Sequence, residues 1–184
     1  MVKAKRSGNI GIEDTATVEI PITALASGGT PPAAVTRAPF RGYAYTIGDD
    51  SYFEHTVPKD WEYAGAGTVI AVYVRWACNE NYAAGNGEVQ WRAAYENVDQ
   101  NNQAIGGGTG ANLDSGDVNI PATALQIQET AIGNIVAANL ARVDTIGVTL
   151  SRIALAGGAD PTAEPEIYAV WFQYTRLISY NTIN

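Results

Sequence analysis

The strongest constraint on the fold is an alternation of apolar and other side chains at every second position. From Val69 to Cys78 the apolar positions are Ile70, Val72, Val74, Trp76 and Cys78, with Tyr73 and Arg75 between them. A second stretch, Val89 to Tyr95, repeats the pattern after a segment rich in Asn, Gly and Ala. Successive side chains of a strand point to opposite faces, so both stretches are predicted core strands. We expect them to pair as a hairpin.

Similar patterns predict further strands along the chain. Ile146, Val148 and Leu150 alternate with small or polar residues, and a Gly-Gly-Ala-Asp-Pro loop follows at 157–161. In the last clear segment, we expect Tyr168, Val170, Phe172 and Tyr174 on one face, and Ile167, Ala169, Trp171 and Gln173 on the other. Weaker strands are predicted at 15–22, 40–46, 51–57, 118–120 and 125–130. One helix is predicted at 132–143, from apolar residues at helical spacing.

Many short strands separated by glycines and prolines are typical of an all-β fold, here a β-sandwich or jelly roll. The first 39 residues differ from the rest, because 26–39 is rich in Gly, Ala and Pro with one charged residue. We therefore predict an extended N-terminal arm and linker at 1–39 and a β-sandwich domain at 40–184. A frayed terminus followed by an ordinary loop is the alternative.

The charge of the chain restricts its partners. Only 16% of its 184 residues are charged, and 19 acidic against 11 basic residues give a net charge of −8. Such a chain repels a phosphate backbone, so no nucleic-acid partner is expected. The basic N-terminus lacks the apolar stretch of a signal peptide, and the longest apolar run is too short to span a bilayer, so no membrane association is expected.

Groups for catalysis or metal binding are scarce. His55 is the only histidine and Cys78 the only cysteine, which rules out an internal disulfide and leaves no zinc-binding motif. His55 lies in an alternating segment with no nucleophile motif, so we predict no enzyme, no catalytic residue, no cofactor and no metal site. Asp49–Asp50 and Asp114–Asp117 could offer oxygen ligands to calcium, but Asp beside Gly or Ser favours acidic turns.

The four tryptophans are the remaining candidates for binding. Trp76 and Trp91 lie in strongly alternating strands, which favours core packing. Trp61 and Trp171 stay open as interface or ligand-binding residues, including stacking against a carbohydrate.

The linear order of these segments resembles β-sandwich domains of tailed-bacteriophage virion proteins. The likeness covers about 65–176 and rests on the hairpin with Trp76, the segment Gly87 to Trp91 with Tyr95, Ile146 to Arg152, the Ala-Asp-Pro loop, and Tyr168 to Tyr174. It implies a structural protein of the virion, of the capsid cement or decoration type, made in the host cytoplasm. It also implies a homo-oligomer, commonly a trimer, attached to the major capsid protein or other virion subunits.

Within this resemblance, Lys3, Lys5 and Arg6 form the candidate arm that reaches an acidic capsid subunit, and Tyr180 begins a C-terminal segment that could hold a neighbour. Low surface charge agrees with surface buried between subunits. The main alternative is a tail, fibre or carbohydrate- or receptor-binding module that uses exposed aromatics. A single jelly-roll major capsid protein would need a more basic arm, and a cupin-type enzyme would need more than one histidine.

Overall fold

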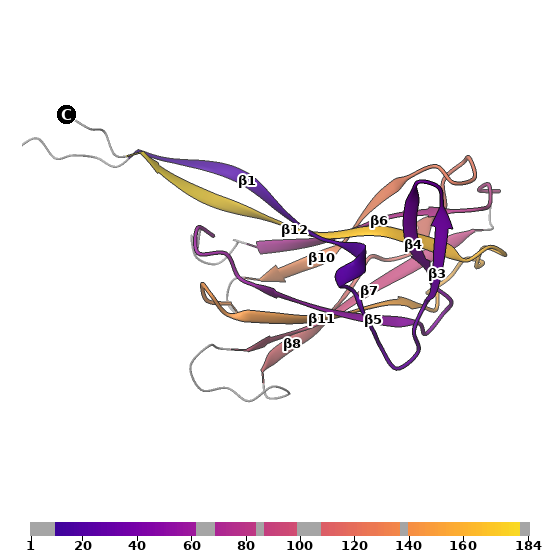
Figure 1. Cartoon of the computed structure of the whole chain (residues 1–184), viewed down its shortest axis with the longest axis horizontal. Coiled ribbons are helices and arrows are strands. Elements are labelled where there is room, and N and C mark those ends of the chain that lie inside the picture. The colour runs from indigo at the N-terminus through magenta and orange to yellow at the C-terminus, as the bar shows by residue number, and fades with distance from the viewer. Residues whose placement is uncertain (1–9, 62–68, 84–86, 99–107, 137–139, 181–184) are drawn as a thin grey trace, which may run out of the picture.

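The computed structural model shows two antiparallel six-stranded sheets that pack as a sandwich (Figure 1). It describes residues 10–61, 69–83, 87–98, 108–136 and 140–180. Sheet A has the order β10-β6-β12-β4-β3, and β1 also pairs with β12. Sheet B has the order β2-β5-β11-β7-β8, and β9 also pairs with β7. The elements are β1 (Ile10–Ile20), η1 (a 3-10 helix, Ile22–Ala24), β2 (Ala26–Ser27), β3 (Ala33–Arg37), β4 (Phe40–Ala44), β5 (Asp50–Thr56), β6 (Val69–Cys78), β7 (Glu88–Val98), β8 (Thr109–Asp114), β9 (Val118–Asn119), β10 (Gln128–Val136), β11 (Thr145–Ile153) and β12 (Pro165–Tyr180).

This architecture confirms the predicted all-β fold, a β-sandwich of two antiparallel sheets. No helix among the described residues has the length and apolar character to cross a membrane.

The core lies between the sheets and is built from the predicted alternating residues. Trp76 of sheet A meets Trp91 of sheet B edge to face at 5.7 Å, and Trp91 meets Tyr45 in the same way at 5.7 Å. Toward the other end of the sandwich, Phe172 of sheet A packs on Phe53 and His55 of sheet B. The predictions of Trp76 and Trp91 as core residues are therefore confirmed, since both have 0% exposure.

The predicted hairpin between β6 and β7 is wrong. β6 pairs with β10 and β12 in sheet A, whereas β7 pairs with β11, β8 and β9 in sheet B. Each strand has one apolar face, and the chain places these faces opposite each other across the core. The connection between the strands therefore crosses from one sheet to the other.

Two β-bulges explain why the predicted helix at 132–143 and the predicted faces of Ile167 and Tyr168 differ from the structure. In β10 the register shifts between Ala131 and Gly133, so that Ile132 and Ile135 both reach the core at a spacing of three residues. The helix predicted at 132–143 is therefore wrong over its described residues, because 132–136 are strand and 140–143 are loop and turn.

The second bulge lies in β12, between Ile167 and Ala169. Ile167 pairs with the inward-facing Trp76 and is fully buried in the core. The Tyr168 hydroxyl instead donates a hydrogen bond to Glu166, the residue two positions before it. Tyr168 and Ile167 are thus exchanged relative to the predicted faces, because the bulge adds a residue to one strand.

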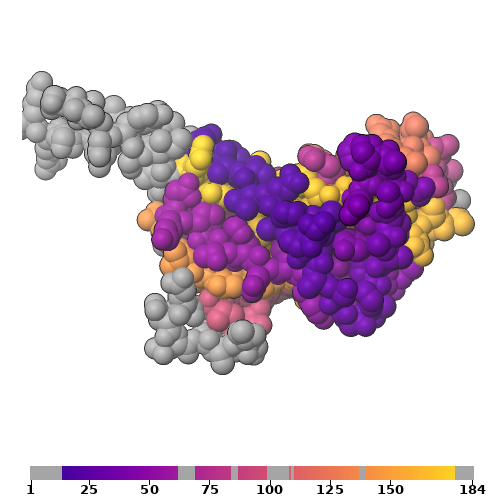
Figure 2. Space-filling view, in the orientation of Figure 1, coloured from indigo at the N-terminus to yellow at the C-terminus, as the bar shows by residue number. Residues whose placement is uncertain are grey.

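Much of the predicted arm and linker belongs to the body of the molecule. β1, β2 and β3 all precede residue 40, and they pair with β12, β5 and β4 respectively. In the space-filling view, the indigo and violet residues of this first part cover much of the near face (Figure 2). The strands of the sandwich thus begin before the predicted boundary.

The core predicts one sharp effect on stability. The Trp76 Nε1–H group donates a hydrogen bond of 2.9 Å to the Thr130 hydroxyl in the interior. Thr130→Val keeps the shape but removes the acceptor, so the free energy of unfolding should fall by about 1–3 kcal/mol. Thr130→Ser keeps the acceptor and is the control. Urea unfolding of the two variants measures the difference, and equal losses would contradict the role of the hydrogen bond.

Candidate interaction surfaces

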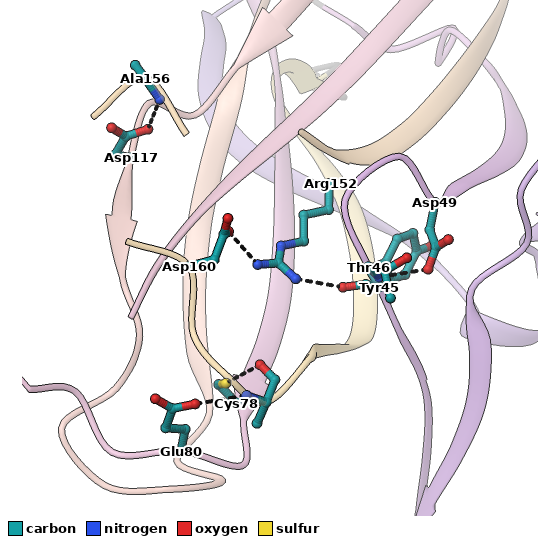
Figure 3. Close-up of polar contacts among 10 residues, drawn as sticks. Tyr45, Thr46, Asp49, Cys78, Glu80, Asp117, Arg152, Ala156 and Asp160 are labelled. Atoms are coloured by element: carbon teal, nitrogen blue, oxygen red, sulfur yellow. Dashed lines mark hydrogen bonds and ion pairs between the residues drawn. The ribbon is translucent and has the colours of Figure 1, made fainter. Parts of the chain in front are cut away.

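One end of the sandwich is held by polar contacts that fix its loops (Figure 3). The Arg152 guanidinium is buried, donates to the Tyr45 carbonyl at 3.1 Å and pairs with Asp160 at 2.6 Å. Glu80 accepts the Ala163 amide at 2.8 Å. These contacts join loops that are distant in sequence, and they therefore stabilise the fold at this end of the sandwich.

The aspartates that could have held calcium bind backbone amides or an arginine. Asp49 accepts the Thr46 amide at 2.7 Å, and Asp50 accepts the amides of Gly29 and Thr30. Asp117 accepts the amides of Ala156 and Gly157, both at 3.0 Å, and Asp114 forms an ion pair with Arg92 at 2.7 Å. This agrees with acidic turns. Within the described residues, no group of three or more His, Cys, Asp or Glu side chains could hold a metal ion.

The single cysteine and the single histidine lie apart from each other. Cys78 has 0% exposure, and burial together with Glu80 raises the pKa of its thiol to about 11. Such a thiol is a poor nucleophile. His55 stacks on Phe172 with 5.1 Å between ring centroids, and burial lowers its pKa.

The two tryptophans left open as binding residues are covered. Trp61 has 0% exposure, its backbone bridges to Arg176, and its carbonyl accepts a hydrogen bond from Arg142 at 2.9 Å. Trp171 lies on the outer face of sheet A with 8% exposure. It stacks on Tyr73 at 5.3 Å with the ring planes 3° apart, and the Arg75 guanidinium lies 5.2 Å from its ring centroid. Neither ring therefore offers a broad face for stacking.

The β3–β4 hairpin is anchored to β12 by an ion pair. Arg37 contacts both carboxylate oxygens of Glu166, at 2.5 Å and 3.2 Å. Burial alone would raise the pKa of Glu166, but hydrogen bonds from Arg37 and Tyr168 lower it. Beside this anchor, Phe40 is 65% exposed and meets Tyr168 edge to face.

The most prominent surface is a two-stranded ribbon formed by β1 and β12, which projects from the sandwich (Figure 1). β6 stops pairing with β12 at Tyr174, whereas β1 continues to pair with β12 up to the pair Ile10 and Tyr180. Asp14 and Arg176 form a cross-strand ion pair at 2.7 Å near its base. We refer to residues 10–15 and 175–180 as the ribbon.

One of the residues predicted to contact a partner, Tyr180, lies in the ribbon. Tyr180 is the last residue of β12 and faces Ile10 in the register. Lys3, Lys5 and Arg6 lie outside the described residues. The sequence alone did not predict the ribbon, because the residues of the first and last strands do not indicate that these two strands pair with each other.

A shallow groove of about 700 Å³ lies on the outer face of sheet B. Tyr52 and Glu54 of β5 line it on one side, and Ala94 and Glu96 of β7 line it on the other. The floor is β11, which offers only Gly147 and Thr149 outward. The alternation of Ile146, Val148 and Leu150 with smaller residues predicts Gly147 and Thr149 as outward positions of a strand. Only the sheet order shows that larger residues flank them.

Comparisons with known proteins give no family for this chain. No family model and no curated protein matches it. Among solved structures, the CBM36-1 domain of a multidomain xylanase from the hindgut metagenome of Trinervitermes trinervoides is 15% identical with a TM-score of 0.44, over 86% of this chain and 96% of that one. A carbohydrate-binding module CBM36 in complex with calcium and xylotriose is 18% identical with a TM-score of 0.45, over 85% and 98%.

A structure of infectious bursal disease virus, Gx strain, is 8% identical with a TM-score of 0.31, over 100% of this chain and 58% of that one. At these values the likenesses carry no argument about what this chain binds.

The position of His55 predicts how stability depends on pH. Its Nε2 atom is buried and has no hydrogen-bond partner among the described residues, so the folded chain favours the neutral ring. The folded-state pKa lies below the unfolded value, so the stabilisation is complete above about pH 6.5 and is lost as the pH falls below it. We expect His55→Phe to flatten the pH dependence of unfolding by urea between about pH 5 and pH 7. Parallel curves for the two proteins would contradict this.

Proposed function

We propose that this chain is a non-enzymatic structural subunit of a tailed-phage virion, of the capsid cement or decoration type. The observation that carries the proposal is the ribbon, which extends the first and last strands beyond the body (Figure 1). The resemblance of the strand order to virion proteins supports the same role.

The ribbon is unlike the edge of a self-contained domain. Beyond the bridge of Trp61 to Arg176, no further strand pairs with the ribbon among the described residues. Two paired strands alone are only marginally stable in water, and open edges favour pairing with another chain. The register pairs Ile10 with Tyr180 and Ile12 with Ile178, in phase with the pair Val18 and Phe172 that faces the core. These register pairs join apolar residue types, and we propose that they pack on another subunit.

We propose that the ribbon packs first on a second copy of this chain, in a trimer, and that the assembly then binds the major capsid protein. The low fraction of charged residues supports buried surface between copies. In the described part of the chain, five arginines each pair with a carboxylate of the same chain, namely Arg37, Arg75, Arg92, Arg152 and Arg176. The arm of Lys3, Lys5 and Arg6 therefore supplies much of the positive charge left for a partner.

The alternative role is a tail or fibre protein or a carbohydrate- or receptor-binding module, which would use exposed aromatics such as Phe40 and Tyr52. All four tryptophans have 8% exposure or less, so a tryptophan platform for sugars does not form on this chain. Capsid binding without glycan binding would separate the two roles, and the opposite result would favour the module.

The ribbon proposal is tested by changing its apolar pairs. In the variant Ile12→Ser with Ile178→Ser, we expect the dissociation constant of the oligomer to rise roughly 100-fold, because each isoleucine contributes about 1.5 kcal/mol or more when buried. Thr15→Ser with Thr175→Ser changes the same strands in the opposite phase and is the control. Analytical ultracentrifugation gives the mass, and circular dichroism confirms folding. A variant of unchanged mass would count against the ribbon.

The basic arm is tested by removing residues 1–7. The described strands begin at Ile10, so the body should keep its unfolding temperature within a few degrees. Occupancy on purified capsids, measured by cryo-electron microscopy, should fall, and more steeply at higher salt because charge contacts are screened. Unchanged occupancy would exclude the arm from capsid binding.

A further inference from the structure

The groove on sheet B is arranged in rows of side chains across three strands. Gly147 of β11 pairs with Glu54 of β5 on one side and with Glu96 of β7 on the other. Neighbouring strands lie about 4.8 Å apart, so the two glutamates face each other across about 10 Å with no side chain between them. The next row places Thr149 between Tyr52 and Ala94.

Gly147 keeps this space open without being required by the fold. A Cβ atom added there would meet only the Glu96 carbonyl oxygen, at 4.0 Å. Its backbone is not in the left-handed region, so packing and conformation both tolerate a larger residue. The glycine thus leaves a gap on the outer face that a side chain from elsewhere can enter.

The residues around the gap combine two carboxylates with apolar surface, which favours a positively charged group at the end of an aliphatic side chain. Glu96 is positioned by the Gly108 amide, which donates to it at 2.7 Å. The Glu54 side chain forms no hydrogen bond or ion pair with the described residues. None of the described residues that line the groove is basic, which disfavours an anionic ligand. The 44% exposed Tyr52 ring and the Ala94 methyl group supply apolar surface beside the carboxylates. A lysine side chain matches both features.

We infer that the groove receives residues 1–9 of a second copy of this chain, with Lys3 or Lys5 between Glu54 and Glu96. In an extended segment Lys3 and Lys5 point to the same side, and their spacing equals that of successive rows along β11. The ribbon carries Ile10 away from its own body. A chain of nine residues spans at most about 30 Å, which is enough to reach a neighbouring copy. This inference rests on the proposed homo-oligomer and names one of its contacts.

Cross-linking between two differently tagged chains tests this contact. One chain carries Ser7→Cys, in phase with Lys3 and Lys5, and the other carries Thr149→Cys on the groove floor. The buried Cys78 thiol should not compete for a short bismaleimide linker. We expect a product between the two chains, measured on the oligomer or on decorated capsids. Its yield should fall about tenfold with Glu54→Gln and Glu96→Gln, which remove the charge, and with Gly147→Val, which fills the gap.

The matched control is Glu19→Gln with Glu164→Gln, which changes the net charge equally at exposed sites outside the groove. Charge exchange adds a gain of signal: a chain with Glu54→Lys and Glu96→Lys should recover cross-linking to a tail with Lys3→Glu and Lys5→Glu. A cross-linking yield that stays unchanged in the groove variants would overturn the inference. Binding of neutral oligosaccharides in the groove in place of residues 1–9 would overturn it as well. If the oligomer persists without this cross-link, the inference fails while the proposed function stands; a chain that neither associates nor binds capsids fails the proposed function itself.

Discussion

The contact between Trp76 and Trp91 across the interior sets the arrangement of everything else. Each indole belongs to a different sheet, and their edge-to-face packing at 5.7 Å joins the two sheets at the centre of the core. Two rings of this size bury a large apolar area and allow few relative positions of the strands that carry them. Tyr45 packs on Trp91, and Thr130 accepts the hydrogen bond from Trp76. Together these contacts fix which face of each sheet points to the core. The outer faces, where partners can bind, follow from that choice.

The sequence predicts the faces of single strands well because alternation is a local property. Ile70 through Cys78, and Val89 through Tyr95, point inward at every second residue as the pattern indicates. Pairing is different, since it depends on which apolar faces meet in space. The β6 and β7 segments look like a hairpin along the chain, but they lie in different sheets and their tryptophans meet across the core.

Bulges limit prediction for a related reason. One extra residue near Ile132 or Tyr168 reverses the alternation beyond it, and nothing in the local residue types marks the place. The candidate surfaces were harder still. Trp61 and Trp171 are candidates by residue type, but both are buried against the rest of the chain. The ribbon and the groove arise from pairing between distant segments, so they are visible only in three dimensions.

β12 connects these observations, because it pairs in different ways along its length. Its first part lies between β6 and β4 in the sandwich, and its last part leaves with β1 alone. A strand held on both sides at one end is rigid there, so the projecting end is aimed by the core rather than by a flexible linker. Since both terminal strands share this direction, a basic N-terminal tail starts at the point farthest along the ribbon. The acidic groove lies on sheet B whereas the ribbon continues sheet A, which is why we propose a contact of tail and groove between copies.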